Sequence, residues 1–335
     1  MGQMANAKGE VQVKRFHVAV RILSLVALVA SAVPAQAQSV TLRYRWTKGA
    51  SLTYRMTNLT NSAIRGMPGV GEMTVGQTLT QVLKMTAEDV APDGTATLRQ
   101  SFESVRMEMN GPMGDVVFDS SVPDKTQNPM TESLGKVVGA LVGESIVVVM
   151  APDGTVRKVD GASRIVDKIA QAMSGDPAAA AAAQGLKAML SDDALKTTLA
   201  QSFSKLPAGA VKAGDTWTGL LAMGNEMIGR VSGTTAFTVK AIEGAADAPL
   251  ARIAVSLTLK QEVVPPPSGP MGMVMRLGDA RGEGEVVFNV AKGYIQRGTM
   301  RTEMPSTMSM TGPEGSPATV QNKTTATMTM EVVEK

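Results

Sequence analysis

Strict alternation of side-chain character over residues 73–90 constrains the fold more than any other feature of this chain. One alternate set carries Met73, Val75, Leu79, Leu83 and Met85, and the other set is mostly threonine. Because successive side chains of a strand point to opposite faces, this pattern predicts a long strand with one face buried and the other in water. The pattern ends at Ala-Pro-Asp-Gly (91–94), where proline presets φ and glycine accepts positive φ, so we expect a turn there.

The run that follows this turn predicts the returning strand of an antiparallel hairpin. Its apolar positions start in one phase and continue one residue out of phase: Ala96, Leu98 and Phe102, then Val105, Met107 and Met109. An alternating pattern that shifts by one residue indicates an inserted residue, so we expect a β-bulge near Glu103–Ser104.

The first 37 residues have the features of a secretory signal peptide. They contain a basic region, an apolar run over residues 22–33 and the potential cleavage site Ala35-Gln36-Ala37. The apolar run is shorter than the roughly 20 residues that cross a bilayer, so an uncleaved anchor is the less favoured interpretation. We therefore expect cleavage after Ala37 and a mature protein that is periplasmic or secreted and does not span the membrane.

Cleavage at this site would change both the charge and the available chemistry. The segment holds four of the 33 Lys and Arg and one of the 30 Asp and Glu, which leaves 29 of each and a mature net charge of zero. A neutral chain gives no electrostatic basis for binding nucleic acid. The single histidine, His17, is also removed, and the chain has no Cys. Catalytic triads, thiol nucleophiles, imidazole or thiolate metal sites and disulfides are therefore excluded.

Other stretches predict further strands on both sides of a segment with helical periodicity. Strands are expected at residues 39–46, 52–59 and 115–120, and again in several runs between residues 237 and 333. Between them, Asn128-Pro129 is a typical helix start, and amphipathic or alanine-rich helices are expected within residues 130–142, 163–173, 178–183 and 191–205. A small hairpin at residues 145–159 interrupts these helices.

This order of elements predicts an α+β fold. Roughly ten long strands tend to curl, so we expect one large curved antiparallel sheet, a half-open barrel, with a mostly helical insert covering one face. The expected divisions are a signal peptide at 1–37, a first β half at 38–127, the mostly helical insert at 128–206 and a second β half at 207–335. Residues 38–335 would form one structural unit.

Methionine is the residue type that frames the functional hypotheses. Of 24 methionines, 22 follow the cleavage site, and four places have methionines two residues apart: 107/109, 271/273/275, 308/310 and 328/330. On a strand this spacing places the thioethers on one face. Three interpretations are open: core packing by a sheet with few aromatic residues, a deformable apolar cavity for a lipid, and Cu(I) binding by thioethers. The cavity candidates are Met107, Met109, Met271, Met273, Met275, Met300, Met328, Met330, Leu257 and Phe288.

Carboxylates close in sequence are the remaining catalytic candidates, and structural roles suit them better. Asp89 and Asp93 flank a turn, Asp192 and Asp193 begin a helix, and Glu283 and Glu285 lie among glycines at a strand start. None of these pairs is placed at an identifiable cleft, so we expect no enzyme activity and no cofactor.

Residues 206–217, Leu-Pro-Ala-Gly-Ala-Val-Lys-Ala-Gly-Asp-Thr-Trp, resemble a segment found in uncharacterised exported bacterial proteins of unknown function. Residues 44–60 and the methionine-rich strands are similar to the same group. The strand–helix–strand order also resembles the half-barrel of periplasmic lipoprotein carriers, which is a likeness of architecture only. Neither resemblance assigns a catalytic residue.

Together these features predict an exported, non-enzymatic binding protein that holds an apolar, lipid-like ligand between a methionine-rich sheet and a helical lid. A structural or protein-interaction module of the cell envelope is the alternative, with an envelope protein as partner. Cu(I) binding by methionine thioethers is the third hypothesis.

Overall fold

The structure is a computed structural model that describes residues 38–66, 71–112, 114–122, 138–172, 192, 195–197, 199, 206–225, 228–264, 274–311 and 317–333. The expected signal peptide, the expected helix start at Asn128-Pro129 and the expected alanine-rich helix at residues 178–183 lie outside these residues. Residues 39–335 form one compact unit, and the description below concerns that unit.

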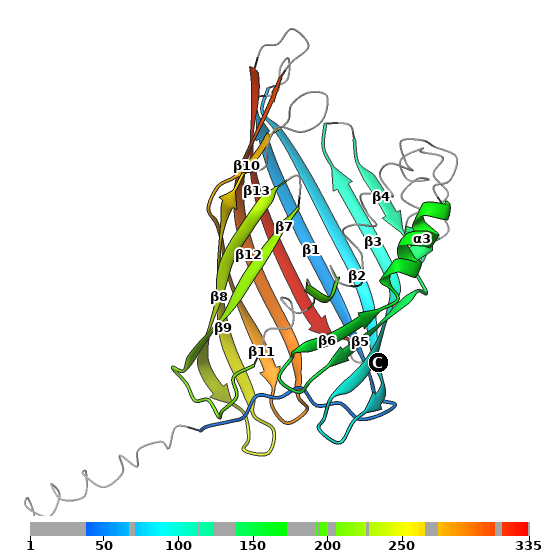
Figure 1. The fold of residues 1–335 in the computed structure, drawn as a ribbon, viewed down its shortest axis with the longest axis vertical. Helices are drawn as coiled ribbons and strands as arrows, with labels where there is room; N and C mark the ends of the chain where they lie inside the picture. Colours follow the sequence, from blue (N-terminus) through cyan, green and yellow to red (C-terminus); the bar gives the residue numbers. More distant parts are fainter. Residues whose placement is uncertain are drawn as a thin grey trace, which may run out of the picture. The chain divides into compact units, whose positions relative to one another are not determined.

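One antiparallel sheet accounts for most of the described residues. Its strands are β1 (Ser51–Arg65), β2 (Met73–Val90), β3 (Ala96–Asn110), β4 (Val116–Asp119), β5 (Ser145–Met150), β6 (Val156–Asp160), β7 (Thr216–Asn225), β8 (Gly229–Glu243), β9 (Leu250–Val263), β10 (Val274–Leu277), β11 (Ala280–Asn289), β12 (Tyr294–Thr311) and β13 (Pro317–Val332). They pair in the order β6-β5-β3-β2-β1-β13-β12-β11-β9-β8-β7, with β4 added to β3 and β10 added to β12 (Figure 1). Within the described residues the chain is therefore a set of meanders joined by the pairing of β1 with β13.

The predicted hairpin is confirmed, together with its bulge. In the pairing of β2 with β3, Val82 lies opposite Ser104 and the next residue, Leu83, lies opposite Phe102. Glu103 is therefore the inserted residue, which explains why the apolar phase of the sequence shifts at this point. The Ala-Pro-Asp-Gly segment between β2 and β3 (91–94) forms the expected turn, with Gly94 at φ +80°.

The predicted α+β class is wrong. Strands make up 65% and helix 8% of the described residues, and the 13-stranded sheet is not closed. Within the segment expected to be a mostly helical insert, the predicted hairpin at residues 145–159 is confirmed as β5 and β6, and the pairing of β5 with β3 makes it part of the sheet. The helix described in full is α3 (Ala162–Ala172), and short helical pieces lie at 138–141, 192, 195–197 and 199. β5 is a continuous apolar run of which Ile146, Val148 and Met150 are buried, so one of its sides adds to the core when it pairs with the sheet.

The expected strand at residues 39–46 is also absent. This segment forms only an isolated bridge between Val40 and Val211, although Val40, Leu42 and Tyr44 alternate as buried side chains. Its backbone bonds to the turns of other hairpins: the Tyr44 amide donates to the Pro152 carbonyl at 2.7 Å and the Arg45 amide to the Gly293 carbonyl at 3.0 Å. The alternation of apolar residues correctly indicated an extended segment with one buried side. It could not indicate whether another strand would pair with that segment.

The main core forms around this segment. Leu42 is fully buried, and the Tyr44 ring meets Phe288 of β11 edge to face with centroids 5.6 Å apart. The same cluster joins Leu98 of β3 and Val148 of β5 with Val239 of β8. Strands near opposite ends of the pairing order therefore share one core, so the sheet bends around residues 40–44 (Figure 1).

Residues 206–217 hold the buried segment at residues 40–45, called the N-terminal strip below, in place. The Arg43 guanidinium donates from Nη1 to the carbonyls of Leu42 and Pro207, each at 2.6 Å. Val40 and Val211 exchange two backbone hydrogen bonds of 2.8 and 2.9 Å. Trp217 then stacks on Phe237 of the following strand, with centroids 5.1 Å apart. These contacts give residues 206–217 a structural role in the fold.

Leu42→Ala should lower the free energy of unfolding by about 2–5 kcal/mol, because the replacement leaves a cavity in a fully buried site. The matched control is Val263→Ala, whose side chain is 50% exposed and should change stability by less than about 0.5 kcal/mol. Urea unfolding measures both values. Equal effects of the two replacements would show that the N-terminal strip does not hold the core.

Candidate functional site

Strand register divides the side chains of the sheet between two faces of different chemistry. One face contains the core residues Tyr54, Leu83 and Phe288. The opposite face is lined by Thr, Arg, Lys and Glu, with surface ion pairs such as Arg55–Glu331 at 3.1 Å and Arg252–Glu285 at 2.9 Å. This is the pattern expected of an antiparallel sheet with only one face turned to water.

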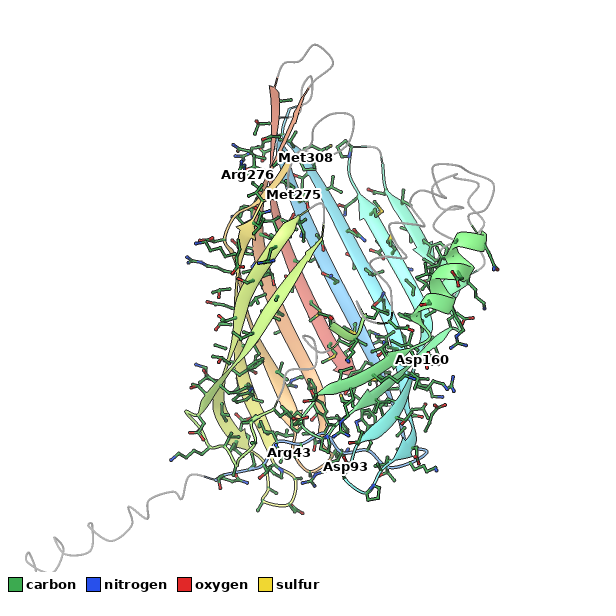
Figure 2. The ribbon with its side chains drawn as sticks, in the orientation of Figure 1. Arg43, Asp93, Asp160, Met275, Arg276 and Met308 are labelled. Atoms are coloured by element: carbon green, nitrogen blue, oxygen red, sulfur yellow. The ribbon has the colours of Figure 1, made fainter. Side chains whose placement is uncertain are left out.

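The methionines of the long strands lie on the same face as the core. Three pairs sit directly opposite each other on neighbouring strands: Met300 with Met328, Met56 with Met330, and Met275 with Met308. Figure 2 shows Met275 and Met308 close together near one end of β10 and β12. We call this surface the methionine face and define it by Met56, Met107, Met109, Met275, Met300, Met304, Met308, Met328 and Met330.

The residues chosen from the sequence divide between this surface and the core. Met107, Met109, Met275, Met300, Met328, Met330 and Leu257 share the methionine face by register. Phe288 is 1% exposed and belongs to the core around Tyr44. Met271 and Met273 lie outside the described residues. The role of the whole set in binding a ligand stays a prediction.

Sequence reasoning left Met56, Met304 and Met308 out of the candidate set. The spacing of Met308 and Met310 was a usable signal for one of them. Met56 stands alone in its strand, and only its position opposite Met330 brings it to this surface. Met56 and Met330 are 274 positions apart in the chain, so no local sequence pattern indicates that they are cross-strand neighbours.

Most of the methionine face is only half-buried. Met56, Met107, Met275 and Met300 have intermediate exposure, and Met328 is 42% exposed. A second small cluster of Val105, Phe118 and Val138 covers part of the face near β3 and β4. The rest presents thioethers without the close packing of the core around Leu42.

Glycines on β11 make room for one of these methionines. A Cβ atom on Gly284 would lie 3.0 Å from the Met300 sulfur, and one on Gly282 would lie 2.7 Å from its terminal methyl. The Met300 side chain therefore extends across the two glycines instead of standing upright on the sheet. Because the glycines have no side chains, the Met300 side chain forms this part of the surface, and its flexible thioether can change conformation to fit a ligand.

Polar groups interrupt the face toward the far ends of the strands. Ser62 and Thr324 share a hydrogen bond of 3.0 Å, and Asn322 lies opposite Ser306. Closer to the core, the Tyr54 hydroxyl donates to the Ile295 carbonyl at 3.0 Å, and burial raises the pKa of Tyr54. Ser306 and Asn322 thus separate the Met275–Met308 pair from the methionines nearer the core.

Two depressions of about 300 and 290 Å³ lie elsewhere in the sheet. The first is lined by residues such as Arg65, Gln321 and Lys323, and the second by residues such as Thr258 and Arg281. Neither includes a methionine of the candidate set, so the candidate site is the broad face itself.

Several of the carboxylates considered for catalysis have structural partners. Asp93 accepts hydrogen bonds from the amide and hydroxyl of Thr95, each at 2.9 Å, and these bonds hold its pKa below the ordinary value. Glu285 accepts two bonds from Arg252, and Asp192 accepts the Ala162 amide at the start of α3 at 2.8 Å. In the part of the chain that the structure describes, no three Asp, Glu, His or Cys residues form a potential metal site.

Comparison with known proteins shows that a family of unknown function, DUF6263, matches this chain over residues 93–295. No curated protein matches the chain. Among solved structures, lipovitellin is similar at 10% identity with a TM-score of 0.41, covering 87% of this chain and 26% of that one. The chain thus spans about a quarter of the lipovitellin chain.

Two other solved structures are similar at lower scores. DynF from the dynemicin biosynthesis pathway of Micromonospora chersina has 10% identity and a TM-score of 0.19, covering 88% of this chain and 85% of its own. An outer membrane channel from Pseudomonas putida F1 has 6% identity and a TM-score of 0.25, covering 87% and 97%. Among the described residues of this chain, no helix has the length and apolar character needed to cross a bilayer.

Proposed function

The chain belongs to the DUF6263 family, whose function is unknown, and from that premise we propose that it is an exported, non-enzymatic protein that binds an apolar, lipid-like ligand on its methionine face. Export rests on the signal-like residues 1–37, and the absence of His and Cys after Ala37 supports a role without catalysis. No cofactor is required for this role.

The observation that carries the proposal is the gathering of thioethers on one half-buried face. Core packing alone would be expected to bury these side chains as completely as Leu42 and Val148, which are 0% exposed, whereas Met328 is 42% exposed. Thioethers are flexible and polarizable, so a surface made of them adapts to ligands of irregular shape. An acyl chain lying across β12, β13 and β1 would contact two of the opposed methionine pairs, Met300–Met328 and Met56–Met330.

The first test is native mass spectrometry of the exported protein purified gently from its host. We expect an added mass of lipid size that is lost on organic extraction, because an apolar ligand would be held by burial of apolar surface. A bare polypeptide mass would instead favour the alternative role, a structural or protein-interaction module of the cell envelope.

A second test compares two neighbouring residues of β13 that point to opposite faces. Met328→Glu places a charge on the methionine face and should raise the Kd for the neutral dye N-phenyl-1-naphthylamine by about tenfold or more, because burying an unpaired carboxylate is costly. Thr329→Glu puts the same charge on the polar face and should leave the Kd within about twofold. Fluorescence titration of both extracted variants measures these values. Equal Kd values would place the dye elsewhere on the protein.

The opposed methionines also favour Cu(I) binding as a second candidate, since thioethers are ligands of soft ions. Replacing both Met328 and Met330 by Leu separates the two functions, because leucine keeps apolar volume and removes the sulfur. Dye binding should be retained in this variant, and Cu(I) titration should show weaker binding than in the unchanged protein only if these thioethers hold the ion.

A further inference from the structure

A band of neutral polar side chains crosses the methionine face. Ser62 of β1 and Thr324 of β13 share a hydrogen bond of 3.0 Å, and the Asn322 amide donates to the Thr324 hydroxyl at 3.2 Å. Ser306 of β12 lies directly opposite Asn322. We call these four residues the polar band. It joins three strands into one hydrogen-bonding strip within an otherwise methionine-rich surface.

The polar band divides the apolar surface unequally. On the side away from the core lies the pair Met275–Met308, near one end of β10 and β12 (Figure 2). On the side of the core lie Met300 and Met328. About 20 Å of extended strand separates Asn322 from Met328. A long acyl chain covers roughly 15 Å in one leaflet of a bilayer, so the surface toward the core is long enough for an acyl chain that begins at the band.

The Asn322 side chain has hydrogen-bonding capacity that the described residues do not use. Its Oδ1 atom is shielded from solvent and accepts no hydrogen bond from any described residue. A shielded acceptor without a partner costs free energy. Because the residue as a whole is only half-buried, its amide can turn toward a bound molecule. A ligand with a hydroxyl group at this place would supply the missing donor.

The three strands that carry the band offer it no charged side chain. Among the described residues of β1, β12 and β13, the register places every Arg, Lys and Glu on the polar face. Arg65 and Lys323 line the depression of about 300 Å³ that Asn322 also borders. Arg65 is already paired with Glu72 at 2.8 Å, and Lys323 with Glu303 at 3.6 Å. An anionic headgroup on the band would lose hydration without gaining a counter-charge, which is costly.

We propose that the ligand of the methionine face is a neutral lipid whose uncharged headgroup carries hydroxyl groups and lies on the polar band, with its acyl chain extending toward Met328. This inference rests on the binding function proposed above and narrows it to one class of lipid. The hydroxyl groups donate to Asn322 and accept from Ser306, and the acyl chain lies against the thioethers. A few polar groups in a mostly apolar site fix the orientation of a ligand in this way. An acylglycerol has the required chemistry.

Two lipids that differ in one group test this inference. Monooleoylglycerol and its phosphate ester share the acyl chain, the ester and the glycerol, and only the second carries a phosphate. Each is titrated, below the concentration at which it aggregates, into the exported and extracted protein with N-phenyl-1-naphthylamine bound, and fluorescence follows dye displacement. Monooleoylglycerol should have an apparent Kd at least about tenfold lower than its phosphate ester, because the phosphate would be desolvated without a counter-charge.

A cation placed in the band should reverse this preference. In Asn322→Lys the ratio of the two Kd values should shift toward the phosphate ester by about tenfold, because the ammonium group can bond the phosphate. Gln321→Lys is the matched control, since it adds the same charge one residue away on the polar face. It should leave the ratio within about twofold, because solvent and salt screen a charge on that face. Neither position is fully buried, and circular dichroism checks that both variants fold.

Equal dye displacement by the two lipids, or a preference of the unchanged protein for the phosphate ester, would overturn the inference and leave apolar binding in place. A Kd ratio that is the same in Asn322→Lys as in the unchanged protein would show that the headgroup does not lie on the polar band. Failure of the protein to bind the dye at all would instead contradict the function proposed above, and the inference would fall with it.

Discussion

Hydrogen bonding of the strip at residues 40–45 to the turns of distant hairpins is the constraint on which this structure depends. Among the described strands, the sheet of 13 is open, and no pairing of its two end strands holds those ends together. The strip supplies this connection through the Pro152 carbonyl on the side of β5 and β6 and the Gly293 carbonyl on the side of β11 and β12. Its buried side chains Leu42 and Tyr44 then fill the space between the two sides.

The same constraint explains the segment at residues 206–217. Its carbonyls accept from Arg43, Val211 bridges Val40, and Trp217 anchors the following strand on Phe237. Each of these contacts holds the strip or places β7, and none presents a reactive group. The segment therefore belongs to the architecture of the fold, which agrees with the lack of catalytic features in it.

Long strands extend beyond this core, and there the two faces of the sheet become unequal. Threonines and ion pairs suit the polar face to water, and thioethers on the other face are only half-buried. A sheet that continues past its own core with an apolar face is suited to contact something outside the chain.

The sequence by itself determined the strands, the hairpin and even its bulge at Glu103, because alternation, turn residues and phase shifts act within a few residues. It also placed Met328 and Met330 on one face, since spacing of two residues suffices for that. Only the tertiary structure decided that residues 39–46 form no ladder, that the predicted hairpin at residues 145–160 pairs with β3 and extends the sheet, and that Met56 meets Met330. These outcomes depend on which distant strand or turn offers a partner. Pairing energies between residues hundreds of positions apart leave no periodic trace in either segment alone.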